Sequence, residues 1–116
     1  MTGKVVFHLD LDDKGRLAMA LTNVSNLLKD PFGKDAAIWV LANGKAVGLF
    51  EKRAAFSEAA GIAELQEKGV RFLLCNNALN AFNLKREDMV SGCEVVPAGV
   101  VALIRMQQDG FAYIKP

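Results

Sequence analysis

The chain has 116 residues, the usual length of one domain, and 52% of them are apolar, against about 45–50% in a typical soluble protein. Its 14 basic and 13 acidic side chains nearly cancel and form no dense Lys/Arg cluster, which argues against a general nucleic-acid binder. The N-terminal segment turns acidic at Asp10 after too few apolar residues for a signal peptide, and no apolar run has the length of a membrane span. We therefore expect a single domain over residues 1–116, in the cytoplasm, whose surplus apolar surface meets another copy of the chain.

The first half of the chain predicts a strand, a helix and a second strand. Residues 4–10 are a β-branched and aromatic run without turn residues, which is typical of a buried strand. Residues 16–29 place leucine and valine at helical spacing, and the Asp30–Pro31 pair ends that helix. Residues 36–42 predict the second strand. Residues 44–56 show no clean period and predict a mobile loop with a helical turn.

The second half continues the alternation. We expect Ser57 to cap a helix that ends at Lys68, with Gly69 as its left-handed stop. Three shorter elements then follow, a strand at 70–75, a helix at 77–83 and a strand at 93–96.

The last helix is almost wholly apolar. Pro97 is expected to open it, because the missing N–H of proline costs least at a helix start, and Gly110 is expected to end it. Its lack of a polar face indicates that one side packs on the sheet and another on a partner subunit. A fifth strand is predicted at 111–114.

Strands that alternate with helices predict an α/β fold, here a single-domain three-layer sandwich around a mostly parallel five-stranded sheet. In such sheets ligands bind beyond the carboxyl ends of the strands. That edge is expected to hold Asp10–Asp13, Asn43, Cys75–Asn77 and Pro97.

Cys75 stands where one strand ends and the next helix starts. The unpaired N–H groups and positive dipole of that helix favour a nucleophilic thiolate over a thiol. The alternative is that Cys75 is a small buried apolar residue. Asn76 and Asn77 can donate hydrogen bonds to such a sulfur, but asparagine at a helix start is first of all a cap, and we favour that role for at least one of them. Lys85 and Arg86, in a turn, are expected to be solvated.

The second cysteine, Cys93, is expected to be structural. It begins the strand after that of Cys75 and therefore lies at the opposite edge of the sheet, too far away for a disulfide. Both thiols are thus predicted to be free, in a reducing compartment.

His8 shares a strand face with Asp10, so it can act as a proton acceptor or be a core histidine with one satisfied hydrogen bond. One histidine without a second ligand cluster predicts no metal site. The motifs GxGxxG, GxxxxGK[ST] and GxSxG are missing from the sequence, so nucleotide binding and serine hydrolysis lack support, and no cofactor is expected.

Three stretches resemble the DsrE/DsrF-like family, whose fold is also called YchN-like: Lys4–His8, Gly69–Asn77 followed by Asn83–Leu84, and, most specifically, Val96–Pro116. The resemblance covers nearly the whole chain. It implies a compact α/β domain that assembles as trimers or as dimers of trimers. In the best understood members it also implies a cysteine that carries a persulfide between proteins of a sulfur relay, and Cys75 matches the position of that cysteine.

Three hypotheses of function follow. In the first, the chain is a small sulfur carrier rather than a turnover enzyme, and forms a homotrimer or homohexamer in which Cys75 takes a persulfide sulfur from a donor protein and passes it to an acceptor by thiol exchange. In the second, the strand-edge crevice of a non-catalytic module, lined by residues such as Asn43 and Cys75, holds a small ligand or a protein partner. In the third, an enzyme uses His8 and Asp10, which must then converge with Cys75 in one pocket.

Overall fold

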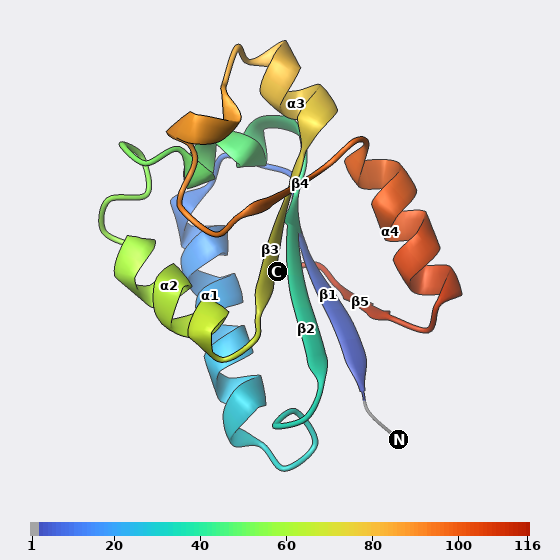
Figure 1. The fold of residues 1–116 in the computed structure, drawn as a ribbon. Helices are drawn as coiled ribbons and strands as arrows, with labels where there is room; N and C mark the ends of the chain where they lie inside the picture. The colour runs from blue at the N-terminus through green and yellow to red at the C-terminus, as the bar shows by residue number, and fades with distance from the viewer. Residues whose placement is uncertain (1–2) are drawn as a thin grey trace.

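A five-stranded sheet in which every strand is parallel forms the centre of the molecule (Figure 1). The structure is a computed structural model and describes residues 3–116. Its strands are β1 (Lys4–Leu9), β2 (Ala37–Ala42), β3 (Arg71–Cys75), β4 (Glu94–Val96) and β5 (Ala112–Ile114). They lie in the order β4-β3-β2-β1-β5, which confirms the predicted α/β sandwich with five strands.

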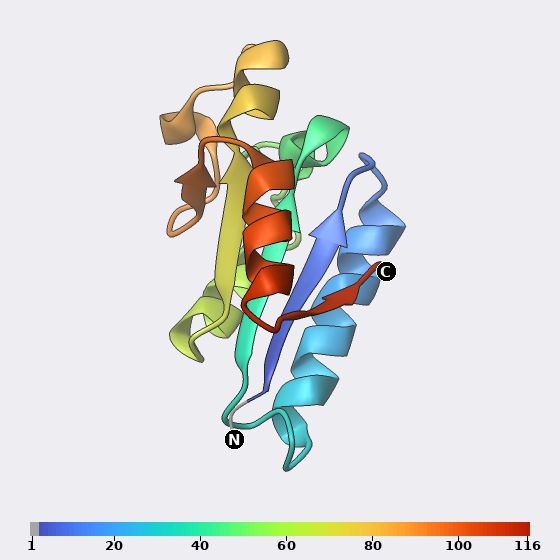
Figure 2. The same cartoon turned by 90° about the vertical axis from the view of Figure 1, so that its right-hand side faces the viewer.

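Helices cover both faces of the sheet. The helices α1 (Lys14–Lys29) and α2 (Ala59–Glu67) lie on one face, and α4 (Gly99–Gln108) lies on the other (Figures 1 and 2). The short helices α3 (Asn76–Ala81) and η1 (Gly44–Phe50) sit at the end toward which the strands point, and η2 (Arg86–Asp88) follows α3. Among the helices of residues 3–116, none combines the length and the hydropathy that a membrane span requires.

The two faces of the sheet have cores of very different size, because successive strand side chains point to opposite faces. Val5, Phe7 and Leu9 of β1 join the larger cluster, which also includes buried residues of α1, α2 and η1. The smaller cluster lies beneath α4 and consists of Val6, Leu41, Leu73, Leu103 and Met106. Only one helix thus shields the second face.

The first helix follows the predicted pattern and begins two residues earlier. The Asp13 carboxylate accepts hydrogen bonds from the backbone N–H groups of Gly15 (2.8 Å) and Arg16 (3.2 Å), so it satisfies the free donors of the first turn. Leu17 and Val24 then bury the apolar stripe against the sheet.

Two helix starts differ from the prediction. Ser57 is not the cap of α2, which starts at Ala59, because the Ser57 hydroxyl donates instead to the neighbouring Glu58 carboxylate at 2.7 Å. Pro97 does not open α4. Ala98 is still extended, and its carbonyl accepts the first helical hydrogen bond from Ala102, so the helix begins only at Gly99. The stop at Gly69 is confirmed, with a φ of 92°.

The segment predicted as a mobile loop is partly regular. Residues 44–50 form the 3₁₀ helix η1, which buries Ala46, Val47, Leu49 and Phe50. A 3₁₀ helix has three residues per turn, so its buried positions fit neither the α-helical nor the strand period. The predicted helical turn is therefore present, but the sequence pattern did not indicate its length or its burial.

Candidate functional site

The carboxyl ends of the strands form one edge of the sheet. Leu9 pairs with Ala42, and Cys75 pairs with Val96, so the residues that follow these positions leave the sheet at the same end. The structure therefore brings together the candidates His8, Asp10, Asn43 and Cys75 at the ends of three adjacent strands.

Cys75 is the last residue of β3 and is only 6% exposed. Its sulfur accepts a hydrogen bond from the backbone N–H of Gly99, with 3.2 Å between nitrogen and sulfur. The predicted donor, the start of α3, is wrong, since the Cys75 side chain makes no capping bond there. The sulfur faces α4 instead, and the first turn of that longer helix supplies the N–H group.

Gly99 lets α4 approach the sheet this closely. A Cβ atom at this position would lie 3.0 Å from Cβ of Asn43 and 3.2 Å from Cβ of Cys75, tighter than side chains normally pack. The absence of a side chain is thus what allows the N–H to reach the sulfur. It also means that Asn43 and Cys75 flank the same glycine.

His8 is buried and uses both of its ring nitrogens. Nε2 lies 2.8 Å from Oδ1 of Asn43, and Nδ1 lies 2.5 Å from the hydroxyl of Tyr113. Because Oδ1 only accepts hydrogen bonds, Nε2 carries the proton, and Nδ1 accepts from the tyrosine hydroxyl. His8 therefore has two satisfied hydrogen bonds, which hold its ring nitrogens against Asn43 and Tyr113.

Asp10 is occupied by the C-terminal segment. Nζ of Lys115 lies 2.5 Å from its Oδ1, and this contact with the ammonium, together with its charge, lowers the pKa of Asp10 below the usual value. Asp10 is thus an ionised carboxylate paired with Lys115 at the rim of the site.

Asn76 and Asn77 are the first two residues of α3 and are exposed. The predicted capping role is wrong, because α3 has no side-chain cap, and its N-cap position is held by Cys75 itself. Lys85 and Arg86 are exposed as well, beside the sheet edge in the connection after α3.

Cys93 precedes β4 and is half-buried. Burial, and to a lesser extent the negative charge of Glu94, raise the pKa of its thiol to about 12. Val96 is the partner of Cys75 in the sheet, so Cys93 lies three strand positions away, roughly 10 Å at the usual rise. Both cysteines are free, as predicted.

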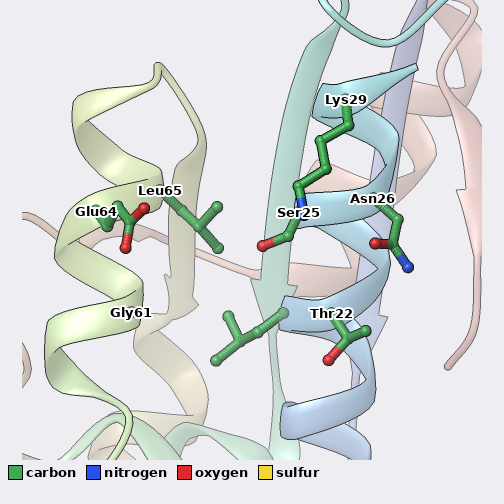
Figure 3. Close-up of a pocket in the computed structure, with 8 residues that line it drawn as sticks. Thr22, Ser25, Asn26, Lys29, Gly61, Glu64 and Leu65 are labelled. Atoms are coloured by element: carbon green, nitrogen blue, oxygen red, sulfur yellow. The ribbon is translucent and has the colours of Figure 1, made fainter.

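Two cavities lined by residues that the structure describes do not include Cys75 in their walls. The groove between α1 and α2 has a volume of about 300 Å³, with Ser25 and Lys29 on one wall and Glu64 and Leu65 on the other (Figure 3). It lies on the face of the sheet opposite α4, so it does not reach the sulfur.

A second cavity, of about 470 Å³, opens at the carboxyl edge. Asp12, Lys14, Lys45, Leu49 and Phe82 are among its lining residues. Neither Cys75 nor Asn43 lines it, so this cavity is a different one from the crevice that was predicted around those two residues.

Gly99 and Tyr113 are the two site residues that the sequence did not single out. Glycine in the first turn of a predicted helix was the available signal for Gly99, since glycine disfavours helices without a packing reason. Tyr113 gives no such signal, because its contact with His8 spans 105 positions of the sequence.

A family model described as the DsrE/DsrF-like family matches residues 4–116. Among solved structures, the chain is similar to MTH1491, a protein of unknown function from Methanobacterium thermoautotrophicum, with 35% identity and a TM-score of 0.89. That match covers 98% of this chain and 99% of the other.

A second solved structure shares the fold. The chain is similar to BT1422, a conserved protein of unknown function from Bacteroides thetaiotaomicron, with 17% identity, a TM-score of 0.74, and coverage of 97% and 94% of the two chains. No curated protein matches the chain.

Proposed function

Because this chain belongs to the DsrE/DsrF-like family, we propose that it is a small sulfur carrier in which Cys75 accepts a persulfide sulfur and passes it on. The observation that carries the proposal is the hydrogen bond from the backbone N–H of Gly99 to the sulfur of Cys75. The position of Cys75, at the carboxyl end of a parallel strand, adds to it, because ligands in open α/β sheets gather at that edge.

The uptake step exchanges one sulfur–sulfur bond for another. The Cys75 thiolate attacks the terminal sulfur of a donor persulfide, R–S–SH, and the donor leaves as the thiolate RS⁻. Cys75–S–SH forms and then loses its proton to water. One S–S bond breaks and one forms, so no oxidant or reductant is needed.

Release runs through the same sulfur in the opposite sense. An acceptor thiolate attacks the terminal sulfur of the Cys75 persulfide, and Sγ of Cys75 departs as a thiolate. A hydrogen bond from a backbone N–H to Sγ stabilises that departing charge, as donors fixed before a reaction do elsewhere. The same bond stabilises the attacking thiolate in the uptake step.

Donor and acceptor proteins would approach along the exposed residues around the sulfur. Asn76 and Asn77, which follow Cys75, and Pro97, which follows its sheet partner Val96, are exposed, while Cys75 itself has 6% of its surface accessible. Free thiols at Cys75 and Cys93 suit a reducing compartment, so we include a cytoplasmic location in the proposal.

Self-association through α4 is also part of the proposal. Val100, Val101 and Ile104 on the outer side of α4 are 59%, 43% and 51% exposed. Three adjacent aliphatic side chains on one helix suit the core of an interface between copies, as in a homotrimer or homohexamer.

Mass spectrometry after incubation with glutathione persulfide tests the carrier function. We expect the wild-type protein to gain one sulfur atom on the peptide that contains Cys75. Cys75→Ser should lose the adduct, whereas Cys93→Ala, the matched control, should keep it. A wild-type protein without the adduct, under conditions that modify free cysteine, would contradict the proposal.

The cavity at the carboxyl edge supports a second candidate function, binding of a small anionic ligand. Lys14 and Lys45 supply two positive charges against the one negative charge of Asp12, and Leu49 and Phe82 supply apolar surface around about 470 Å³. A bound ligand would raise the melting temperature equally in the wild type and in Cys75→Ser, because Cys75 is not in the cavity wall. A screen of small carboxylates and phosphates by thermal shift would test it.

A further inference from the structure

His8 is a buried polar residue that the sulfur exchange described above does not use. It is 9% exposed, stands among apolar residues of the strand β1, and directs its ring toward the α4 side, where Asn43 and Tyr113 meet it. A polar group is retained in a core only with its hydrogen bonds satisfied, and His8 satisfies both.

The hydrogen bonds of His8 fix the orientation of the Asn43 amide. Oδ1 of Asn43 is the amide atom that lies 2.8 Å from Nε2 of His8, so Nε2 donates to it and Nδ1 is left to accept from the Tyr113 hydroxyl. The oxygen end of the amide is therefore turned to His8. Nδ2, with its two hydrogens, is the other end of the amide.

The side chains of Asn43 and Cys75 leave the backbone close to each other. Their Cβ atoms lie 3.0 Å and 3.2 Å from one point, the position of a Cβ on Gly99. The N–H of Gly99 is already committed to Sγ of Cys75. A persulfide places its charge one atom further out, on the terminal sulfur, so that atom needs a donor of its own.

We propose that Asn43 is this donor, binding the terminal sulfur of the Cys75 persulfide through its amide N–H, and that His8 and Tyr113 are positioning residues that hold the amide in this orientation. The inference rests on the proposed carrier function. An amide turned the other way would direct its oxygen at the anion and repel it, and it would require the other tautomer of His8, in which Nδ1 donates to the Tyr113 hydroxyl.

The test measures how readily the bound persulfide ionises. The protein is loaded with glutathione persulfide, freed of excess donor, and reacted with iodoacetamide over a range of pH, because the persulfide anion is the reactive form. Loss of a charge-assisted hydrogen bond should raise the midpoint of this pH profile by about one unit.

Two kinds of variant separate an effect on the orientation of the Asn43 amide from a general loss of protein stability. Asn43→Asp replaces the amide hydrogens by an oxygen, and His8→Phe removes the hydrogen bond to Oδ1, so both should raise the midpoint. His8→Gln can still donate to Oδ1 and should restore the wild-type midpoint. Asn23→Asp, the same exchange at an exposed position of α1, is the matched control.

The outcomes distinguish the inference from the proposed function. A raised midpoint in Asn43→Asp and His8→Phe, with recovery in His8→Gln, supports the inference. Wild-type midpoints in folded Asn43→Asp and His8→Phe, with Cys75 still loaded, overturn the inference and leave the carrier function standing. No adduct on wild-type Cys75 overturns both.

Discussion

The backbone N–H of Gly99 is hydrogen-bonded to the sulfur of Cys75 although 24 positions separate the two residues. The contact joins the end of β3 to the start of α4 across one layer of the sandwich. Glycine favours this contact, because a Cβ on residue 99 would lie 3.0 Å from Cβ of Asn43 and 3.2 Å from Cβ of Cys75, so that these neighbours would have to shift by a few tenths of an ångström.

Gly99→Ala should push the start of α4 away from Cys75 and weaken the hydrogen bond to the sulfur. The added methyl group overfills a closely packed site, so we expect the free energy of unfolding to fall by about 1–3 kcal/mol. The rate of sulfur uptake on Cys75 should fall as well. Urea denaturation and mass spectrometry measure the two effects.

Gly61→Ala is the matched control for that substitution. Gly61 is an exposed residue inside α2, and a Cβ there would meet nothing within 4 Å. Alanine in a helix interior is more favourable than glycine by about 0.5–1 kcal/mol, so this variant should gain stability and keep sulfur uptake. Equal losses in both variants would contradict the role given to Gly99.

The two cysteines should react at very different rates with iodoacetamide at neutral pH. Exposure alone favours Cys93, which is half-buried, over Cys75, which is buried. Thiolate chemistry favours the opposite order, because the pKa of Cys93 is raised to about 12, whereas the sulfur of Cys75 receives an N–H hydrogen bond. We expect Cys75 to be labelled about tenfold faster or more. Peptide mapping of timed samples measures both rates, and the unfolded protein in urea should show similar rates.

Glu94→Gln tests an ion pair at the beginning of β4. Two guanidinium nitrogens of Arg71 lie 2.7 Å and 2.6 Å from the Glu94 carboxylate, and these hydrogen bonds lower the pKa of Glu94 below its usual value. The pair is half exposed, so the substitution should cost about 0.5–1 kcal/mol at pH 7.

The pH dependence of that loss has a defined sign. A carboxylate whose pKa is lowered by folding contributes stability above its unfolded value of 4.5, and the contribution disappears as the pH falls through the lower folded value. The difference between wild type and Glu94→Gln should therefore shrink below pH 4.5. Glu87→Gln, at an exposed position in η2, is the matched control and should lower the free energy of unfolding at pH 7 by less than Glu94→Gln does. A stability difference between wild type and Glu94→Gln that persists at low pH would contradict the role given to the Arg71–Glu94 ion pair.

Ile104→Glu should disrupt self-association through α4. A carboxylate placed in an apolar interface without a partner loses its hydration. The free-energy cost of this loss exceeds the free energy that one residue gains by burial in such an interface. Met19→Glu is the matched control, since Met19 on α1 has nearly the same exposed fraction, 53% against 51%. Sedimentation velocity should find wild type and Met19→Glu as oligomers and Ile104→Glu as a monomer. A monomeric wild type would refute the interface.

The sequence predicts the sheet and most helices because their signals are local. The β-branched run of β1 and the leucine spacing of α1 appear within single segments, and the structure has both. The sequence predicts the start of α4 at Pro97, two residues too early, because no local pattern shows that Ala98 is extended.

The site was only partly predictable, because some of its contacts join residues that lie far apart in the sequence. Cys75 and Asn43 each end a predicted strand, so their common edge follows from the parallel order. The donor to the sulfur was assigned to α3, the next helix in sequence, whereas Gly99 of α4 supplies it. The bond between Tyr113 and His8 depends on β5 returning beside β1, which no local pattern specifies.

The small core beneath α4 has a consequence for the hydrogen bond to Cys75. Few buried side chains hold this helix, so its local unfolding requires less free energy than unfolding of the central strands. Hydrogen–deuterium exchange should accordingly be faster in α4 than in β1 or β2. Each transient detachment of α4 would also withdraw the N–H of Gly99 from the sulfur, so in the proposed carrier the stability of this one helix governs how long Cys75 keeps its hydrogen bond.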